Sequence, residues 1–368
     1  MGGRRLSRLA RSEKAERHRT GVTDLKSRLI AMIQASGPIS VATYMDLCLH
    51  DRQHGYYATR PGLGQDFITA PETSQVFGEL IGLWAAQEWQ DMGAPQRVSL
   101  IEIGPGRGTL MADALRATAR IEGFHAALDL IFIEPSPILR ANLKRKFDAR
   151  FLSDLSDVPT DQPLLLIANE WLDCLPVQQF IKVGADWHER VIGLDDSDQL
   201  TFGLKVDAMP SGAITPENQA ALELQPGLKT LSETLHHLFE TAAGRALFID
   251  YGTVNGAPDD TLRSYLSGQQ IDPLAEPGGS DLTCDVDFLR LQKLAGAQGL
   301  HVDGPISQSQ FLLSLGAEAR LNQLAQQHPD RADDLHARVR SLVDPAEMGT
   351  RFQAIAIANS GASRATAF

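Results

Sequence analysis

The feature that most constrains the fold is a glycine-rich turn that directly follows an apolar strand. The apolar run Val98 to Ile103 leads into Gly104-Pro-Gly-Arg-Gly108. Glycines at 104, 106 and 108 let the backbone turn tightly and approach a bound ligand, because a Cβ would clash or force an unfavourable φ. A helix is expected from Thr109, and its first N–H groups have no partner within the helix. The pattern indicates a nucleotide-binding α/β fold, although an ordinary strand–helix turn shares the bare glycine spacing.

Short apolar strands alternate with helices along most of the chain. Strands are predicted at 98–103, 128–134, 150–152, 163–169, 245–251 and 351–358, and helices at 109–120, 136–147, 228–243 and 286–298. Alternation at these lengths indicates right-handed crossovers and a mostly parallel sheet. We therefore predict an α/β fold with a doubly wound, seven-stranded, Rossmann-like sheet.

Three further regions are predicted around this sheet. Residues 1–21 form a flexible basic tail, and residues 22–95 form an N-terminal helical extension with a lid loop at 51–72. Residues 96–368 form the core. It carries an insertion at about 177–227, in which strand-like segments at 177–183, 187–194 and 200–205 indicate a β-meander within a β-meander/helical subdomain.

Composition excludes several function classes. The net charge of −12 argues against broad nucleic-acid binding, which requires Lys and Arg to neutralise phosphates, and suits a basic partner. No apolar run approaches the roughly 18 to 20 residues of a membrane span, so no membrane insertion is expected. Cys48, Cys174 and Cys284 lack paired-ligand spacing, and no metal site is predicted.

The first 20 residues contain seven Lys or Arg and are not followed by an apolar segment, which excludes a secretory signal. A frayed tail is the preferred interpretation, and a mitochondrial presequence stays open. The predicted location is the cytoplasm for a bacterial protein and the mitochondrial matrix for a eukaryotic one.

Two acidic residues sharpen the prediction of the ligand, and the first of them distinguishes it from a dinucleotide. Glu102 stands two places before Gly104, where it would face a pyrophosphate unfavourably but could accept hydrogen bonds from the α-ammonium group of a methionine moiety. Glu134 follows the next strand, where an acidic side chain can bind both ribose hydroxyls. The pattern favours S-adenosyl-L-methionine, held by Glu102, Gly104, Gly106, Gly108, Glu134 and Asn169.

A third polar group follows the apolar strand at 163–169. Asn169 and Glu170 end this strand and therefore lie at the carboxyl edge of the sheet, where such folds bind ligands. If the methyl acceptor is a guanidinium, Glu170 and Asp173 can orient its N–H groups by hydrogen bonding. We predict Glu170, Asp173 and Asn169 as catalytic residues; a strand-end capping cluster is the alternative.

The Gly-, Pro- and Tyr-rich stretch at 51–72 is predicted to form a lid over the donor pocket. Aromatic rings could cover an adenosine or a substrate side chain, and a carboxylate would add charge at the mouth of the pocket. A loop whose aromatics pack on the core is the alternative. The residues assigned to the lid and the substrate are Tyr56, Tyr57, Asp66, Phe67 and Thr69.

Beyond the basic tail, nearly the whole chain resembles the MidA-like methyltransferases, which have a mitochondrial branch. The resemblance is carried by several motifs: His54-Gly-Tyr-Tyr57, Gly64-Gln-Asp-Phe-Ile-Thr-Ala-Pro-Glu72, Phe77-Gly-Glu79, the glycine turn, Glu134-Pro-Ser-Pro137, Asn169-Glu170 with Asp173 and Leu175-Pro176, Asp250-Tyr-Gly252, Asp260-Thr-Leu-Arg263, Pro277-Gly278 with Asp281-Leu-Thr283, and Asp287-Phe288. Trp171 and Cys174 stand where Phe and Ala are common, which puts the pocket shape in doubt more than the reaction.

The resemblance implies a seven-stranded methyltransferase sheet with S-adenosyl-L-methionine as donor. In the mitochondrial branch it also implies a protein arginine as acceptor, on a subunit of a complex I-type respiratory assembly. The predicted function is therefore a protein arginine methyltransferase whose partner is a protein with an accessible arginine. The alternatives are a non-catalytic assembly chaperone that binds the same cofactor and a dinucleotide-dependent oxidoreductase.

Overall fold

The computed structural model describes residues 25–59, 69–205 and 219–368. The chain divides into two compact units. The first unit comprises Met1–Arg60, Pro176–Leu224 and Asp259–Cys284, and the core unit comprises Pro61–Leu175, Gln225–Pro258 and Asp285–Phe368. The domain boundaries expected near residues 22 and 96 stay a prediction.

The core unit is built on a mixed, mostly parallel sheet. Its strands lie in the order β15-β16-β10-β5-β2-β3-β4, and the short β14 pairs with β10. Strands β10, β5, β2, β3 and β4 are parallel, whereas β16 is antiparallel to both β10 and β15. The strands are β2 (Val98–Ile103), β3 (Leu128–Ile133), β4 (Arg150–Leu152), β5 (Leu164–Asn169), β10 (Gly244–Thr253), β14 (Val286–Asp287), β15 (His301–Ser307) and β16 (Phe352–Ala358).

This order confirms the predicted seven-stranded, Rossmann-like sheet. Six of its strands match predicted segments, but β15 does not, because His301, Asp303, Gly304 and Pro305 interrupt its apolar pattern. An antiparallel neighbour on one side lets this half-buried strand form without a continuous apolar run.

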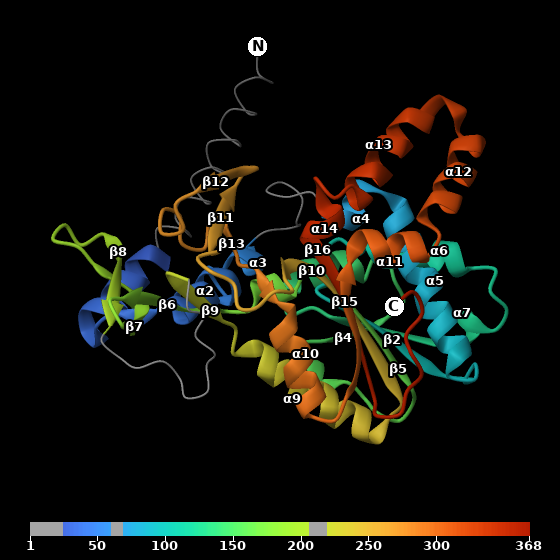
Figure 1. The fold of residues 1–368 in the computed structure, drawn as a ribbon, viewed down its shortest axis with the longest axis horizontal. Helices are drawn as coiled ribbons and strands as arrows, with labels where there is room; N and C mark the ends of the chain where they lie inside the picture. Colours follow the sequence, from blue (N-terminus) through green and yellow to red (C-terminus); the bar gives the residue numbers. More distant parts are fainter. Residues whose placement is uncertain (1–24, 60–68, 206–218) are drawn as a thin grey trace, which may run out of the picture. The chain divides into compact units, whose positions relative to one another are not determined.

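Helices cover both faces of the sheet, as a doubly wound fold requires. In β5, Leu165 and Ile167 belong to one apolar cluster and Leu164 and Leu166 to another, because successive side chains point to opposite faces. The first cluster packs under helices α5, α6, α11 and α13, and the second under α9 and α10. Figure 1 shows α9 and α10 on one side of the sheet, away from α5 and α11.

The helices of the core unit include the four predicted segments and three separate helices in the stretch at 308–342. They are α4 (Ala70–Thr73), α5 (Gln75–Asp91), α6 (Thr109–Thr118), α7 (Phe124–Ala127), α8 (Pro137–Leu143), α9 (Gly227–Thr241), α10 (Phe288–Ala297), α11 (Gln308–Ser314), α12 (Ala317–Gln327), α13 (Ala332–Val343) and α14 (Met348–Arg351), with 3-10 turns η1 (Leu155–Asp157), η2 (Leu172–Cys174) and η3 (Pro329–Arg331).

The first unit combines helices with two antiparallel sheets. Residues 25–36 are helical, and α2 (Val41–His50) and α3 (Tyr56–Thr59) follow. Strands β6 (Gln178–Val183), β7 (Asp186–Leu194) and β8 (Leu200–Lys205) form the predicted meander, joined by β1 (Ile39–Ser40) and β9 (Ala221–Leu224). The second sheet contains β11 (Arg263–Leu266), β12 (Gln269–Ile271) and β13 (Asp281–Thr283).

Candidate active site

The glycine turn leaves β2 in a conformation that side chains rarely adopt. Gly104, Gly106 and Gly108 have φ values of +65°, +53° and +75°. A Cβ on Gly108 would lie 2.6 Å from the Phe147 ring, and one on Gly104 would lie 3.1 Å from the Trp171 ring. The turn therefore requires glycine for both its backbone angles and its close packing.

Glu102 lies in β2, two residues before the turn, with only 4% of its surface exposed. Its Oε2 atom is buried and has no hydrogen-bond partner within the described part of the chain. Removal from water raises the pKa of this carboxyl to about 8. A buried acceptor of this kind is costly unless a ligand supplies a donor.

Asn169 and Glu170 occupy the end of β5, next to β2 in the sheet. Glu170 has φ of +51°, a left-handed backbone that is unusual for a residue with a side chain and is often found at functional sites. Its Oε1 accepts hydrogen bonds from Ala70 N at 2.9 Å and from Asn169 Nδ2 at 3.0 Å. The Asn169 Oδ1 atom is buried and has no partner among the described residues.

The Glu170 carboxyl is poised between its two protonation states. Desolvation raises its pKa to about 7; the Ala70 N–H bond opposes this shift, the Asp173 carboxyl adds to it, and the Asn169 amide opposes it. A positively charged group beside Glu170 would favour the ionised form. This matches the predicted role on the acceptor side, which stays a prediction.

Asp173 lies in η2, and both of its carboxylate oxygens accept hydrogen bonds from the chain. Oδ2 accepts a hydrogen bond from Tyr251 Oη at 2.8 Å, and Oδ1 accepts one from Cys174 Sγ at 3.2 Å. Asp173 is not among the residues that line the pocket described next. Its predicted pairing with Glu170 on a guanidinium stays a prediction.

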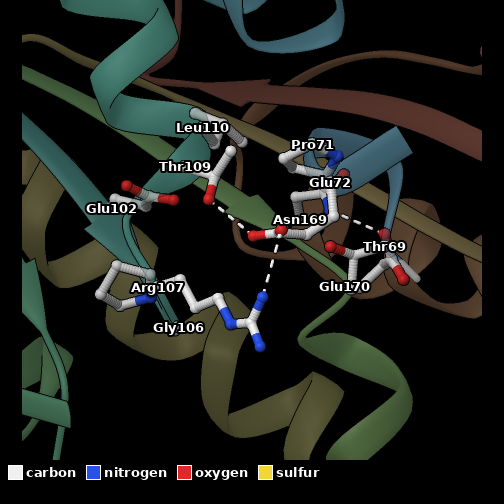
Figure 2. A pocket seen from close by; sticks show the side chains of 12 residues that line it. Thr69, Pro71, Glu72, Glu102, Gly106, Arg107, Thr109, Leu110, Asn169 and Glu170 are labelled. Atoms are coloured by element: carbon white, nitrogen blue, oxygen red, sulfur yellow. Dashed lines mark hydrogen bonds and ion pairs between the residues drawn. The ribbon is translucent and has the colours of Figure 1, made fainter. Parts of the chain in front are cut away.

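A pocket brings the glycine turn and the end of β5 together. The space it outlines, including the part open to solvent, is about 500 Å³. Figure 2 shows the side chains around this space. The lining residues are Thr69, Pro71, Glu72, Glu102, Gly104, Pro105, Gly106, Arg107, Thr109, Leu110, Asn169 and Glu170.

Glu134 follows β3, the neighbour of β2, and is 4% exposed. Its Oε1 accepts a hydrogen bond from Ser136 N at 2.8 Å, and burial raises its pKa to about 7. Glu134 does not line the pocket. Its role toward a ribose stays a prediction.

The residues assigned to the lid fall into three groups. Thr69 lines the pocket. Tyr56 and Tyr57 belong to α3 of the first unit, where Tyr56 is 3% exposed and Tyr57 Oη donates to Asp281 Oδ1 at 3.3 Å. Asp66 and Phe67 lie outside the described residues. The lid stays a prediction.

The sequence analysis did not single out three residues that line the pocket: Glu72, Arg107 and Thr109. Thr109 Oγ1 donates to Glu72 Oε1 at 2.6 Å, and Arg107 Nη1 lies 3.5 Å from Glu72 Oε2 (Figure 2). Glu72 ends the motif at 64–72 that carries the family resemblance, and its place three residues after Thr69 resembles a helix capping box. Thr69 makes no such cap, and Glu72 points to α6 instead.

The pocket fits the aminoacyl end of S-adenosyl-L-methionine. Glu102 Oε2 and Asn169 Oδ1 are buried acceptors that await donors, as an α-ammonium group would provide. The glycine turn leaves room for close approach of a ligand to the backbone. Glu102, Asn169 and the turn are therefore the residues that would hold the cofactor.

The described residues contain no group of three or more His, Cys, Asp or Glu side chains that could hold a metal ion. None of the helices among them is both long and apolar enough to cross a bilayer.

The family model and the relatives that this chain matches are all methyltransferases by name. Residues 80–306 match the S-adenosyl-L-methionine-dependent methyltransferase family. The mitochondrial protein arginine methyltransferase NDUFAF7 homolog of Drosophila melanogaster is 35% identical, over 94% of this chain and 86% of its own length. NDUFAF7 of Homo sapiens is 33% identical, over 91% and 83%.

A solved structure with the same fold gives further support for this family. A superfamily member from Burkholderia thailandensis, bound to S-adenosyl-homocysteine, has a TM-score of 0.82 and 25% identity and covers 95% of each chain. The family match, the relatives and this fold confirm the resemblance and the predicted donor. The chain therefore belongs to the MidA-like family of S-adenosyl-L-methionine-dependent methyltransferases.

Proposed function

We propose that this methyltransferase modifies an arginine side chain of a protein, with Glu170 holding the acceptor guanidinium. Relatives that match more than 90% of the chain are protein arginine methyltransferases by name. The pocket supports the same acceptor, because Glu170 borders it beside Glu102 and the glycine turn.

When bound, the cofactor supplies an electrophilic methyl group on its sulfonium. Glu170 accepts hydrogen bonds from the guanidinium N–H groups and draws positive charge away from the attacking nitrogen. Asn169 orients this carboxyl through the hydrogen bond from its Nδ2 to Glu170 Oε1. As the N–C bond forms and the S–C bond breaks, the guanidinium releases one proton, and a carboxyl with a pKa of about 7 can take it at neutral pH.

One observation carries this proposal. The two hydrogen bonds found at Glu170 Oε1 come from neutral groups, the Ala70 amide and the Asn169 side chain, while the surroundings raise its pKa to about 7. Bidentate pairing with a planar cation is the interaction that best offsets this desolvation. An arginine guanidinium has the required charge and shape.

The first test is methyl transfer from isotopically labelled S-adenosyl-L-methionine to proteins from a strain that lacks this enzyme, followed by amino-acid analysis. The proposal predicts labelled methylarginine with the wild-type enzyme and none with Gly106→Val, whose Cβ would disturb the cofactor turn. Label on another residue type would contradict it.

We further propose that the acceptor is a subunit of a complex I-type respiratory assembly, in line with the family resemblance. Mass spectrometry of arginine methylation in the deletion strain and its parent tests this idea. A difference confined to one respiratory subunit would support it, and a difference only elsewhere would contradict it. The relatives are mitochondrial by name, and the compartment of this chain stays a prediction.

A further inference from the structure

The short helix α4 connects the two sides of the pocket. At one end, Ala70 N donates to Glu170 Oε1 at 2.9 Å. Two residues later, Glu72 Oε1 accepts a hydrogen bond from Thr109 Oγ1 at 2.6 Å. A segment of four residues therefore contacts both the acceptor-side carboxyl and the helix that follows the glycine turn.

Glu72 also lies close to the N-terminus of α6. Thr109 is the first residue of α6, whose N-cap is Gly108 and makes no side-chain hydrogen bond. A carboxylate near a helix N-terminus interacts favourably with the helix dipole and its free N–H groups. The Glu72 side chain is 27% exposed and lies 3.5 Å from the Arg107 guanidinium of the turn. It thus holds the turn through a hydroxyl bond and an ion pair.

These contacts join α4, which carries Ala70 N, to the start of α6 and to the glycine turn. The hydrogen bond from Ala70 N favours the ionised form of Glu170, and it requires α4 to stay in place. Arg338 Nη1 on α13 adds a bond to Thr73 O at 3.2 Å, at the far end of α4. The bonds made by Glu72 are the ones that join α4 to the cofactor turn.

We propose that Glu72 is a positioning residue that fixes α4 on the glycine turn and so presents the Ala70 amide to the Glu170 carboxylate. The inference rests on the proposed function, because it gives Glu170 the acceptor role. It adds a physical link between the cofactor side and the acceptor side of the pocket. A change at Glu72, which contacts the cofactor turn, alters the protonation of Glu170.

The test compares Glu72→Ala and Glu72→Gln with wild type in steady-state methylation from pH 5.5 to 9. Glu72→Ala should lower kcat/KM roughly 10- to 100-fold and move the acidic limb of the kcat/KM profile to higher pH, because Glu170 in the free enzyme loses a hydrogen bond to its ionised form. Glu72→Gln keeps an acceptor for Thr109 and should restore much of the rate. Glu122→Gln, an exposed acid elsewhere in the core unit, is the matched control and should match wild type.

A purely structural role would lower kcat/KM without moving the pH limb, and that result overturns the inference. If Glu72→Ala does not fold, Thr109→Val provides the same comparison, since it removes the hydroxyl that binds Glu72. Labelled product from the wild type reports separately on the proposed function. If that product is not methylarginine, the proposed function fails; if it is and the limb stays fixed, only the role of Glu72 fails.

Discussion

Two carboxyl groups at the ends of neighbouring parallel strands show how the same chemistry can serve structure or function. Asp250 in β10 is fully buried and accepts backbone hydrogen bonds from Trp171, Leu172 and Asp173 on Oδ2, at 2.8 to 3.2 Å, and from Tyr251 on Oδ1 at 2.9 Å. Glu170 directly follows β5, the strand next to β10. It accepts one hydrogen bond from a backbone N–H and one from a side chain, and it borders the pocket.

The two carboxyl groups differ in the source of the hydrogen-bond donors around them. The chain itself supplies four N–H groups to Asp250, and three of them belong to the start of η2, so Asp250 works as a cap for that turn. Desolvation, together with the Asp173 and Glu170 carboxyls, raises the pKa of Asp250. Glu170 keeps acceptor capacity toward the pocket, which is what a binding residue requires.

The largest expected effect is on stability at Asp250. Asp250→Ala leaves three buried N–H groups of η2 without acceptors and should lower the free energy of unfolding by about 3 kcal/mol or more. Denaturant unfolding measures the loss. A midpoint close to that of wild type would show that Asp250 is not the structural member of the pair.

Glu170→Gln should separate activity from stability. We expect methyl transfer to fall about 100-fold, since the neutral amide cannot pair with a guanidinium. Because the pKa of Glu170 is raised to about 7, its ionised form is costly at pH 8, and the neutral variant should unfold no more readily than wild type there. A matched pair of thermal melts and initial rates checks both statements. Equal losses of rate and stability would remove the contrast with Asp250.

Glu102→Gln sharpens the comparison on the cofactor side. Loss of the carboxylate that we propose to pair with the α-ammonium group should weaken cofactor binding about 10-fold, with little change in fold, because the amide has the same shape. Calorimetric titration with S-adenosyl-homocysteine measures the change. Unaltered affinity would remove Glu102 from the site.

The smallest effect is the pH dependence of the wild type. In the proposed mechanism the ionised form of Glu170 binds the acceptor, and its raised pKa means that this form is lost as the pH falls through about 7. We expect kcat/KM to fall up to tenfold per pH unit below that value and to level off above it. Glu170→Gln should lack this limb; an unchanged limb in the variant assigns the titration to another group.

Sequence alone could predict the sheet and the cofactor turn, because both depend on local patterns. The acid at 102 stands beside the glycine turn in the chain, and the pair at 169–170 directly follows an apolar strand. The structure places Glu102, Gly104, Gly106, Asn169 and Glu170 around one pocket. The seventh strand was not located, since β15 is half-buried and lacks apolar periodicity.

The parts that sequence reasoning missed depend on contacts distant along the chain. Glu72 meets Thr109 across 37 positions, and Asp250 caps a turn more than 70 positions earlier. Thr69 to Glu72 has the spacing of a local helix cap, whereas tertiary packing directs Glu72 to another helix. Only a three-dimensional arrangement reveals which acceptors are satisfied by the chain and which are left for a ligand.

The central claim is that Glu170, unlike Asp250, has acceptor capacity left to bind the guanidinium of the methyl acceptor. Calorimetry of an arginine peptide binding to the complex of the enzyme with S-adenosyl-homocysteine, at pH 6 in buffers of different ionisation enthalpy, tests it directly. A carboxyl with a pKa of about 7 is mostly protonated at this pH and must ionise to pair with the guanidinium, so we predict release of close to one proton, absent in Glu170→Gln. Binding without proton release, or equal release in the variant, would contradict the account.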